Sequence, residues 1–305
     1  MYFPYLRGRQ YELLVLRELA EENLLGMHVI PIIEPVKISP TFMSTMEAFA
    51  KAEQKIALIF NPEVGDLAGK KQKTVNDLRI FLEGGKVVPS IIVNTSALEC
   101  LRELQIASGN ILTILDNGDF LKTYEAVFGS DSPLFTLFPD DRRIRRVVRE
   151  NKILFEDKFQ KKPRNADYPE DEFLSDDHLY YIEEGYQGFG DYSIVGNEFT
   201  ESAFAPRAVA IHIAYFDKDN ALRIRHFISD SNEGISDVAG KFAEAVSKLA
   251  AWYKNVEPKP FTRGLQTLLR HYANGTYPGL PTLKKLSIMH HLELIGQFLN
   301  EVEAK

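Results

Sequence analysis

The sequence predicts an α/β protein folded as a TIM-like (β/α) barrel, with an irregular last third. Short apolar runs alternate with amphipathic segments of helical periodicity over the first half of the chain. Successive apolar runs start about 20 to 30 residues apart, a spacing typical of βαβ units. The runs are almost continuously apolar, which is typical of parallel strands covered on both faces. An open mixed α/β sheet is the alternative that the same pattern allows.

Each of the first five predicted strands in this region is followed by a predicted helix. The strands are expected at 28–33, 55–60, 87–93, 110–115, 133–138 and 152–155. The helices are expected at 8–25, ahead of the first strand, and then at 41–54, 71–83, 96–107, 119–128 and 140–151. Ser39 or Thr41 is the expected N-cap of the helix at 41–54, because both side chains can accept a hydrogen bond from a backbone N–H group.

The two strands that would complete an eight-stranded barrel are expected at 191–196 and 208–216. Only about 11 residues separate them, which is short for a parallel crossover of a dozen residues or more. The segments 208–216 and 222–228 are joined by DKDNA, which predicts an antiparallel hairpin. The chain then becomes helical, with helices expected at 236–254, 261–274 and 281–303.

This pattern predicts a barrel domain over residues 1–235, interrupted by a long insertion at 157–190. The insertion is rich in charged residues, Tyr, Pro and Gly, as expected of a lid or a binding loop. The helical region 236–305 is expected to pack on the barrel as part of the same domain.

Composition limits the classes of function. The net charge of −7 and the pI of about 5.6 argue against sequence-blind nucleic-acid binding, which needs many Lys and Arg residues. The single cysteine, Cys100, excludes an internal disulfide and a zinc site built on cysteine pairs, and it favours a cytoplasmic location. No apolar run reaches the roughly 18 to 20 residues that span a bilayer, so we expect no membrane association.

Polar side chains follow the predicted strands. The stretch IPIIEPVK places Glu34 and Lys37 just beyond the first strand. Asn61, Asn94, Asp116 and Glu156 follow four of the other strands. Because ligands in parallel α/β folds bind at the carboxyl ends of the strands, these side chains are expected to share one site. They could hold a divalent cation such as Mg²⁺ or act as a general acid and base, whereas helix capping is the structural alternative for the Asn and Asp residues.

Three further segments add candidate residues. His212 lies between two alanines on one face of a predicted strand, so it is a candidate catalytic base or a partly buried histidine hydrogen-bonded to a neighbour. Asp191 and Tyr192 follow the glycine-rich stretch GYQGFG and are candidates to line a pocket. Arg7, after the aromatic start YFPYL, is a candidate contact for a phosphate or a carboxylate.

Motifs for nucleotides and for histidine-bound zinc are absent from the sequence. There is no GxxxxGK[ST], no GxSxG and no HExxH, and the G-x-x-G-x-G spacing precedes a strand instead of joining a strand to a helix. No nucleotide cofactor is therefore expected, and the sequence does not identify a metal.

Three motifs carry a family resemblance: YFPYLRGRQYELLVLREL at the start, IPIIEPVK, and GFGDYSIVG with AVAIHIAYFD. With these motifs the chain resembles the phage-type "Beta protein" family of bacterial and phage proteins over roughly residues 1 to 255. The positions that match are Arg7, Gly8, Gln10, Glu12, Glu34, Lys37, Gly190, Asp191, Tyr192 and His212. The resemblance implies a phage-related setting and a small protein partner from an adjacent gene, but it implies no catalytic assignment.

Two functions remain open from the sequence. The first is a hydrolase or lyase with a phosphate- or carboxylate-bearing substrate, in which Glu34, Asp116, Glu156 and His212 perform acid–base chemistry or bind metal. In this reading Lys37 and Arg7 hold the anion. The second is a non-catalytic binding or regulatory partner in a phage-defence or toxin–antitoxin-like module.

Overall fold

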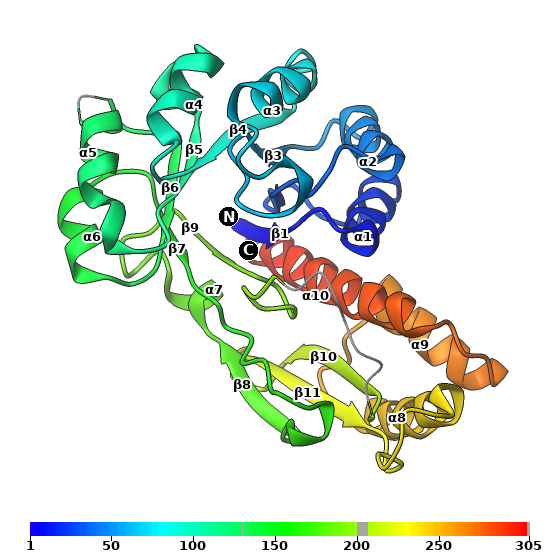
Figure 1. Ribbon diagram of the computed structural model, residues 1–305. Helices are drawn as coiled ribbons and strands as arrows, with labels where there is room; N and C mark the ends of the chain where they lie inside the picture. Colours follow the sequence, from blue (N-terminus) through cyan, green and yellow to red (C-terminus); the bar gives the residue numbers. More distant parts are fainter. Residues whose placement is uncertain (130, 200–206, 304–305) are drawn as a thin grey trace. The chain divides into compact units, whose positions relative to one another are not determined.

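The computed structural model describes residues 1–129, 131–199 and 207–303 (Figure 1). The chain divides into two compact units. The barrel unit comprises Met1–Glu156 and Tyr180–Tyr192, and the second unit comprises Asp157–Leu179 and Ser193–Lys305.

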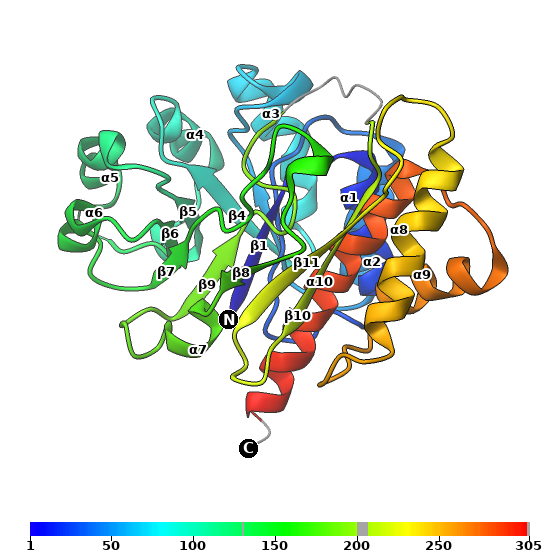
Figure 2. The same cartoon turned by 90° about the horizontal axis from the view of Figure 1, so that it is seen from below.

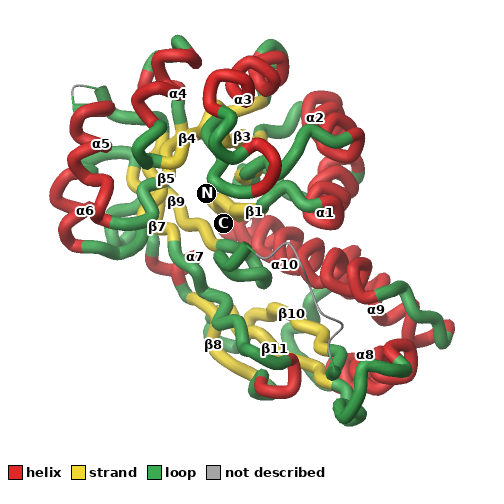
Figure 3. Tube along the Cα trace, viewed as in Figure 1, coloured by secondary structure: helices red, strands yellow, loops and turns green. Residues whose placement is uncertain are grey.

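Within the described residues of the barrel unit, eight parallel strands close into a barrel in the order β1-β2-β3-β4-β5-β6-β7-β9 (Figure 3). The strands are β1 Tyr2–Leu6, β2 Ile32–Ile33, β3 Ile56–Ile59, β4 Val87–Ile92, β5 Leu112–Ile114, β6 Phe135–Phe138, β7 Lys152–Phe155 and β9 Gly188–Asp191. The α-helices are α1 Gln10–Glu21, α2 Pro40–Lys51, α3 Lys71–Leu78, α4 Ala97–Leu104, α5 Leu121–Phe128 and α6 Arg142–Val147. Four 3₁₀ turns lie between them, at Gly65–Leu67, Arg79–Leu82, Ser108–Asn110 and Gly118–Phe120. The TIM-like barrel predicted from the sequence is confirmed.

Alternate residues of the strands fill the barrel interior, because side chains of a strand point to opposite faces in turn. The buried cluster inside the barrel consists of Phe3, Tyr5, Ile30, Ile32, Ala57, Ile59, Ile92, Leu112, Ile114, Leu137, Ile153 and Phe155. On five strands the next position of the same parity lies just past the strand's carboxyl end. These five positions are Arg7, Glu34, Asn61, Asn94 and Asp116.

The barrel closes through β9, which pairs in parallel with β1 on one side and with β7 on the other. Gly190 stands opposite Phe3 and Phe155 in these two pairings. A Cβ atom at Gly190 would lie 2.5 Å from the carbonyl oxygen of Phe3. The glycine-rich stretch GFGD is therefore a strand in which only the absence of a side chain lets its neighbours approach.

The strands that close the barrel are not those expected from the sequence. The segments 191–196 and 208–216 were the expected seventh and eighth strands, but the structure uses Tyr2–Leu6 and Gly188–Asp191 instead. Pro4 and the glycines of GFGD are atypical of central strands, which explains why the pattern does not reveal them. The segment expected as an insertion, 157–190, carries β8, α7 and most of the barrel strand β9.

In the second unit, the described strands β10 Ala210–Phe216, β11 Leu222–Ile228 and β8 Asp171–Ser175 form an antiparallel sheet in that order (Figure 2). The predicted hairpin is confirmed, since β10 and β11 pair antiparallel with His212 opposite His226. The remaining helices are α7 Asp177–Tyr180, α8 Val238–Tyr253, α9 Arg263–Asn274 and α10 Leu280–Glu303, with a 3₁₀ turn at Asn165–Asp167. None of the helices in the described residues is both long and apolar enough to cross a membrane.

Candidate functional site

An ion pair between two neighbouring strands lies at the carboxyl end of the barrel. Arg7 follows β1 and Glu34 follows β2, and the Arg7 Nε atom lies 3.4 Å from Glu34 Oε2. Glu34 is 1% exposed, whereas the Arg7 side chain keeps 18% of its surface exposed. The carboxylate is therefore inside the barrel end, and Arg7 is the partner whose side chain keeps exposed surface.

Glu34 holds three neighbours in place. Its Oε2 atom accepts a hydrogen bond of 2.8 Å from the Tyr5 hydroxyl, and its Oε1 atom accepts one of 2.7 Å from the backbone N–H of Glu63. Burial raises the pKa of Tyr5 well above its usual value, and the charge of Glu34 raises it further. The phenol therefore stays protonated and donates to Glu34. With Arg7 as the third partner, the carboxylate organises the site more than it faces a substrate.

Two tyrosine rings flank the Arg7 guanidinium. The Arg7 Cζ atom lies 5.5 Å from the ring centroid of Tyr192 and 5.8 Å from that of Tyr5, within the range of cation–π contacts. The Tyr192 ring packs in turn on Tyr5 and Phe155, with centroid distances of 5.0 and 4.9 Å. Stacked and ion-paired, Arg7 is fixed in direction, as an anion-binding guanidinium must be.

The turn after Arg7 depends on a glycine. Gly8 has a φ of +58°, and a Cβ atom there would lie 3.2 Å from the backbone oxygen of Glu34. Glycine accepts this backbone conformation without strain. The sequence R-G-R therefore brings the end of β1 against the end of β2, which places Arg7 beside Glu34.

Asn61 and Asn94 belong to the framework of the site. The Asn61 side chain bridges to β4 by donating to the carbonyl of Ile92 and accepting from its N–H group, both at 2.8 Å. Asn94 accepts a hydrogen bond of 2.9 Å from the backbone N–H of Ser96, just ahead of α4. It also donates a hydrogen bond of 2.7 Å to Glu63 Oε1. For Asn94, the structural alternative of a turn-forming side chain describes these contacts well.

Asp116 lies near Glu63 at the same end of the barrel. Asp116 is an exposed residue, but partial burial of its carboxyl raises the pKa, and the negative charge of Glu63 raises it further, while backbone hydrogen bonds oppose the shift. Its side chain also accepts a 3.0 Å hydrogen bond from Asn117. A carboxyl group whose pKa is raised in this way is a typical candidate for a general acid.

The chain at the barrel end thus links five of the predicted site residues, Arg7, Glu34, Asn61, Asn94 and Tyr192, and the charge of Glu63 connects them to Asp116. Two members were not predicted, Tyr5 and Glu63. Tyr5 shares the strand face of Arg7, so recognition of 2–6 as a strand would have revealed it. Glu63 contributes a backbone N–H group, for which the sequence holds no signal.

Three other predicted site residues of the barrel unit, Lys37, Glu156 and Asp191, are not among the residues linked to Arg7 and Glu34 above. Lys37 is exposed and makes no hydrogen bond or ion pair with a described residue. Glu156 accepts a hydrogen bond of 3.2 Å from the backbone N–H of Asp140, and its parity is opposite to that of the interior residue Phe155. Asp191 follows Gly190 on the opposite face of β9, and its carboxylate accepts a hydrogen bond of 2.7 Å from the buried Tyr2 hydroxyl.

The barrel position expected for His212 is wrong, because β10 belongs to the antiparallel sheet of the second unit. The Nδ1 atoms of His212 and His226 lie 2.6 Å apart, and His226 Nε2 lies 3.0 Å from Glu172 Oε1. Burial and the neighbouring His226 lower the pKa of His212 to about 3. His212 thus matches the alternative of a partly buried histidine hydrogen-bonded to a neighbour.

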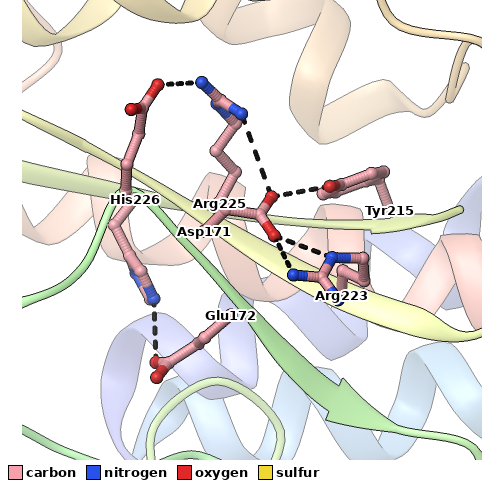
Figure 4. A network of polar contacts seen from close by, with 7 residues as sticks. Asp171, Glu172, Tyr215, Arg223, Arg225 and His226 are labelled. Carbon is pink, nitrogen blue, oxygen red and sulfur yellow. Dashed lines mark hydrogen bonds and ion pairs between the residues drawn. The ribbon is translucent and has the colours of Figure 1, made fainter.

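Figure 4 shows the polar contacts of this sheet, among them the contact between the Glu172 carboxylate and the His226 ring. Asp171 makes its own set of contacts: it accepts a hydrogen bond of 2.6 Å from the Tyr215 hydroxyl and forms ion pairs with Arg223 and Arg225. These contacts join β8, β10 and β11 into one sheet.

Within residues 1–129, 131–199 and 207–303, no group of three or more His, Cys, Asp or Glu side chains is arranged to hold a metal ion. No protein-family model matches the chain, and no curated protein matches it either. What the site does is therefore inferred from its own residues.

Proposed function

We propose that the protein is a hydrolase or lyase that acts on a phosphate- or carboxylate-bearing substrate at the carboxyl ends of the barrel strands. The observation that carries this proposal is the ion pair of Arg7 and Glu34 between the rings of Tyr5 and Tyr192. A closed parallel barrel is the setting in which active sites occupy this end.

Arg7 is the anion-holding residue in this proposal. Its guanidinium presents a planar fork of N–H donors that fits the oxygens of a phosphate or a carboxylate. Glu34 is a positioning residue, because it holds Arg7 and is itself fixed by Tyr5 and by the Glu63 backbone. Binding of the substrate anion at Arg7 places its reacting bond in a fixed position at the barrel end.

Asp116 is the proposed catalytic acid. The raised pKa keeps a larger fraction of its carboxyl protonated near neutral pH than an ordinary aspartate retains. The protonated carboxyl gives its proton to the leaving group as the substrate bond breaks, and the carboxylate that results takes a proton back from the attacking water or from the adjacent carbon. The charge of Glu63 favours the protonated form before each cycle.

The binding-partner alternative would be favoured by an apolar surface gathered on the C-terminal helices. The most exposed large apolar side chains among the described residues are instead spread over both units: Met27, Ile80 and Ile182 in the barrel unit, and Phe173, Ile235, Phe261 and Val302 in the second unit. The catalytic proposal therefore has the stronger support. We also propose, from the sequence motifs, that the chain is related to the phage-type "Beta protein" family and has a small protein partner. The single cysteine supports a cytoplasmic location.

Turnover of a substrate panel tests the proposal. The purified chain is incubated with phosphate monoesters, phosphodiesters, carboxylate esters and hydroxy acids, and products are followed by ³¹P and ¹H NMR. Asp116→Asn is expected to lower kcat by about 10²–10⁴-fold, the usual contribution of a general acid. Arg7→Gln is expected to raise KM, whereas Arg142→Gln on exposed α6 is the matched control and should change neither constant.

If no compound of the panel is turned over while phosphate still binds at Arg7, the enzyme proposal is wrong and the binding-protein alternative takes its place. Equal kcat values for the wild type and Asp116→Asn would remove Asp116 from the mechanism.

A further inference from the structure

The barrel unit contains a pocket to which the proposed function assigns no ligand. It lies beyond the ends of β3 and β4, between the turn at Gly65–Leu67, α3 and α4. Its volume of about 240 Å³ corresponds to about eight water molecules at ~30 Å³ each. Arg7, Glu34 and Asp116 do not line it, but Asn61, Glu63 and Asn94 do, so the pocket adjoins the candidate site and shares these three residues with it.

The floor of the pocket is apolar. Phe60, Val75 and Cys100 line it and are themselves buried, and Leu67 joins them at the edge. Burial raises the pKa of the Cys100 thiol to about 12, so Cys100 is a neutral apolar lining group at physiological pH. A ligand that fills this floor needs a short apolar body.

The walls of the pocket carry one sign of charge. Three glutamates line it, Glu63, Glu99 and Glu103, and none of its described lining residues is a lysine or an arginine. Glu63 is fixed by the 2.7 Å hydrogen bond from Asn94, and Glu103 by one of 3.3 Å from Gln72 on α3. Two of the three carboxylates are thus held by hydrogen bonds from other residues that line the pocket.

The three carboxylates also act on two titratable neighbours. After burial, the charges of Glu103 and Glu99 are the next causes that raise the pKa of Cys100. The charge of Glu63 likewise raises the pKa of Asp116. An ammonium group in the pocket would partly neutralise this negative potential, whereas an anion would make it more negative.

We propose that this pocket binds a small organic ammonium compound: a primary amine, protonated at neutral pH, on an apolar body of about eight non-hydrogen atoms. The apolar part lies against Phe60, Val75 and Cys100, and the ammonium group donates to the carboxylates of Glu63 and Glu99 and to the amide oxygens nearby. The site goes beyond the proposed function, because its ligand has the opposite charge to the anion held by Arg7.

Benzylamine is the probe, because it has this size and is a cation at pH 7. Benzyl alcohol and benzoate are matched controls of the same shape, one neutral and one anionic. Titration by ligand-detected NMR and calorimetry is expected to give benzylamine a Kd of about 1 mM or tighter. Benzyl alcohol should bind about tenfold more weakly, and benzoate should not bind.

Three variants locate the binding. Glu99→Gln is expected to weaken benzylamine binding about two- to fivefold, the effect of one partly exposed charge. Ala68→Phe, at a half-buried position of the pocket lining, fills the space and is expected to abolish binding. Glu125→Gln, on an exposed position of α5 outside the pocket, should leave the Kd unchanged.

Benzylamine that binds no more tightly than benzyl alcohol would overturn the charge assignment. An unchanged Kd in Ala68→Phe would overturn the pocket itself, and the thermal unfolding curve of that variant shows whether it is folded. Phosphate binding, measured on the same samples, tests the Arg7 site separately, so each proposal can fail alone.

Discussion

Glu34, which follows β2, and Arg7, which follows β1, are joined twice, by an ion pair between their side chains at 3.4 Å and by the close approach of Gly8 to the Glu34 backbone. The first contact fixes the direction of the guanidinium, and the second fixes the relative position of the two strand ends. Tyr5 secures the pair from inside the barrel through its 2.8 Å hydrogen bond to Glu34. This relationship links the stability of the barrel to its site.

Loss of the Glu34 charge should destabilise the fold. Glu34→Gln removes the partner of a partly buried guanidinium and is expected to lower the free energy of unfolding by about 2 kcal/mol, less than for a fully buried pair because Arg7 is partly exposed. Tyr5→Phe removes one hydrogen bond to a charged group and should cost about 1.5 kcal/mol. Urea unfolding measures both.

The matched control for Tyr5→Phe is Tyr11→Phe on α1, which removes a hydroxyl that makes no hydrogen bond with a described residue. It should shift the free energy of unfolding by less than about 0.5 kcal/mol. If Tyr5→Phe were as neutral as this control, the Tyr5–Glu34 bond would have no part in holding the site.

The Asp116 carboxyl should work against stability as the pH rises. Its pKa is higher in the folded state than the ordinary value of 3.8, so its ionisation above that value opposes folding. The cost is absent below pH 3.8 and complete above the pKa of the folded state. Asp116→Asn should therefore gain stability relative to the wild type as the pH rises through this window, in unfolding curves recorded from pH 3.5 to 8.

A difference between the two proteins that stays constant across that range would show that the pKa of Asp116 is not raised. A variant that gains stability but loses turnover would support a residue kept for chemistry at a cost in stability.

Gly190 should tolerate no side chain, because its Cβ would meet the Phe3 carbonyl oxygen at 2.5 Å and the Phe155 ring at 3.0 Å. Gly190→Ala forces β9 away from β1 or β7 and is expected to cost about 1–3 kcal/mol of unfolding free energy. Gly84→Ala, where nothing lies within 4 Å of the added atom, is the control and should be nearly neutral. Equal urea midpoints for the two variants would refute the close packing at the barrel seam.

The histidine pair should make the second unit sensitive to acid. The pKa of His212 falls from 6.5 to about 3 on folding, so the stability that its neutral form provides is complete above pH 6.5 and is lost as the pH falls toward 3. His226, whose pKa burial also lowers, and the facing charges of Glu172, Asp171, Lys162 and Lys284 modulate the effect. One proton corresponds to a slope of about 1.4 kcal/mol per pH unit.

Trp252, the single tryptophan of the chain, reports on this unit because its ring packs on Tyr215 and Phe227. His212→Asn keeps a polar group near the Nδ1 position but cannot titrate. Unfolding followed by Trp252 fluorescence between pH 6.5 and 4.5 should have a shallower pH dependence in this variant. Parallel curves for variant and wild type would exclude His212 as the titrating group.

The sequence predicts the barrel because the alternation of strands and helices is visible within short segments. It does not predict the strands that close the barrel, because those are recognisable only from their pairing with distant residues. Tyr2–Leu6 and Gly188–Asp191 are recognisable as strands only once Phe3 is seen opposite Gly190. The hairpin 208–216/222–228 and the final helices, by contrast, are predicted correctly from alternation and periodicity within each segment.

The site follows the same division. Glu34, Asn61, Asn94 and Asp116 follow strands that the sequence reveals, so strand-end reasoning finds them. His212 was misplaced because its strand joins a different sheet, a property of long-range pairing with β11 and not of the residues around it. Tyr5 and the Glu63 N–H group entered only with the three-dimensional contacts of Glu34.

The central claim is that Arg7 holds the anion of a substrate at the barrel end, and titration with inorganic phosphate by calorimetry tests it most directly. The wild type and the control Arg142→Gln should bind one phosphate per chain with the same Kd, and Arg7→Gln should bind at least about tenfold more weakly. Phosphate binding that is unchanged in Arg7→Gln, or absent from the wild type, would contradict the claim.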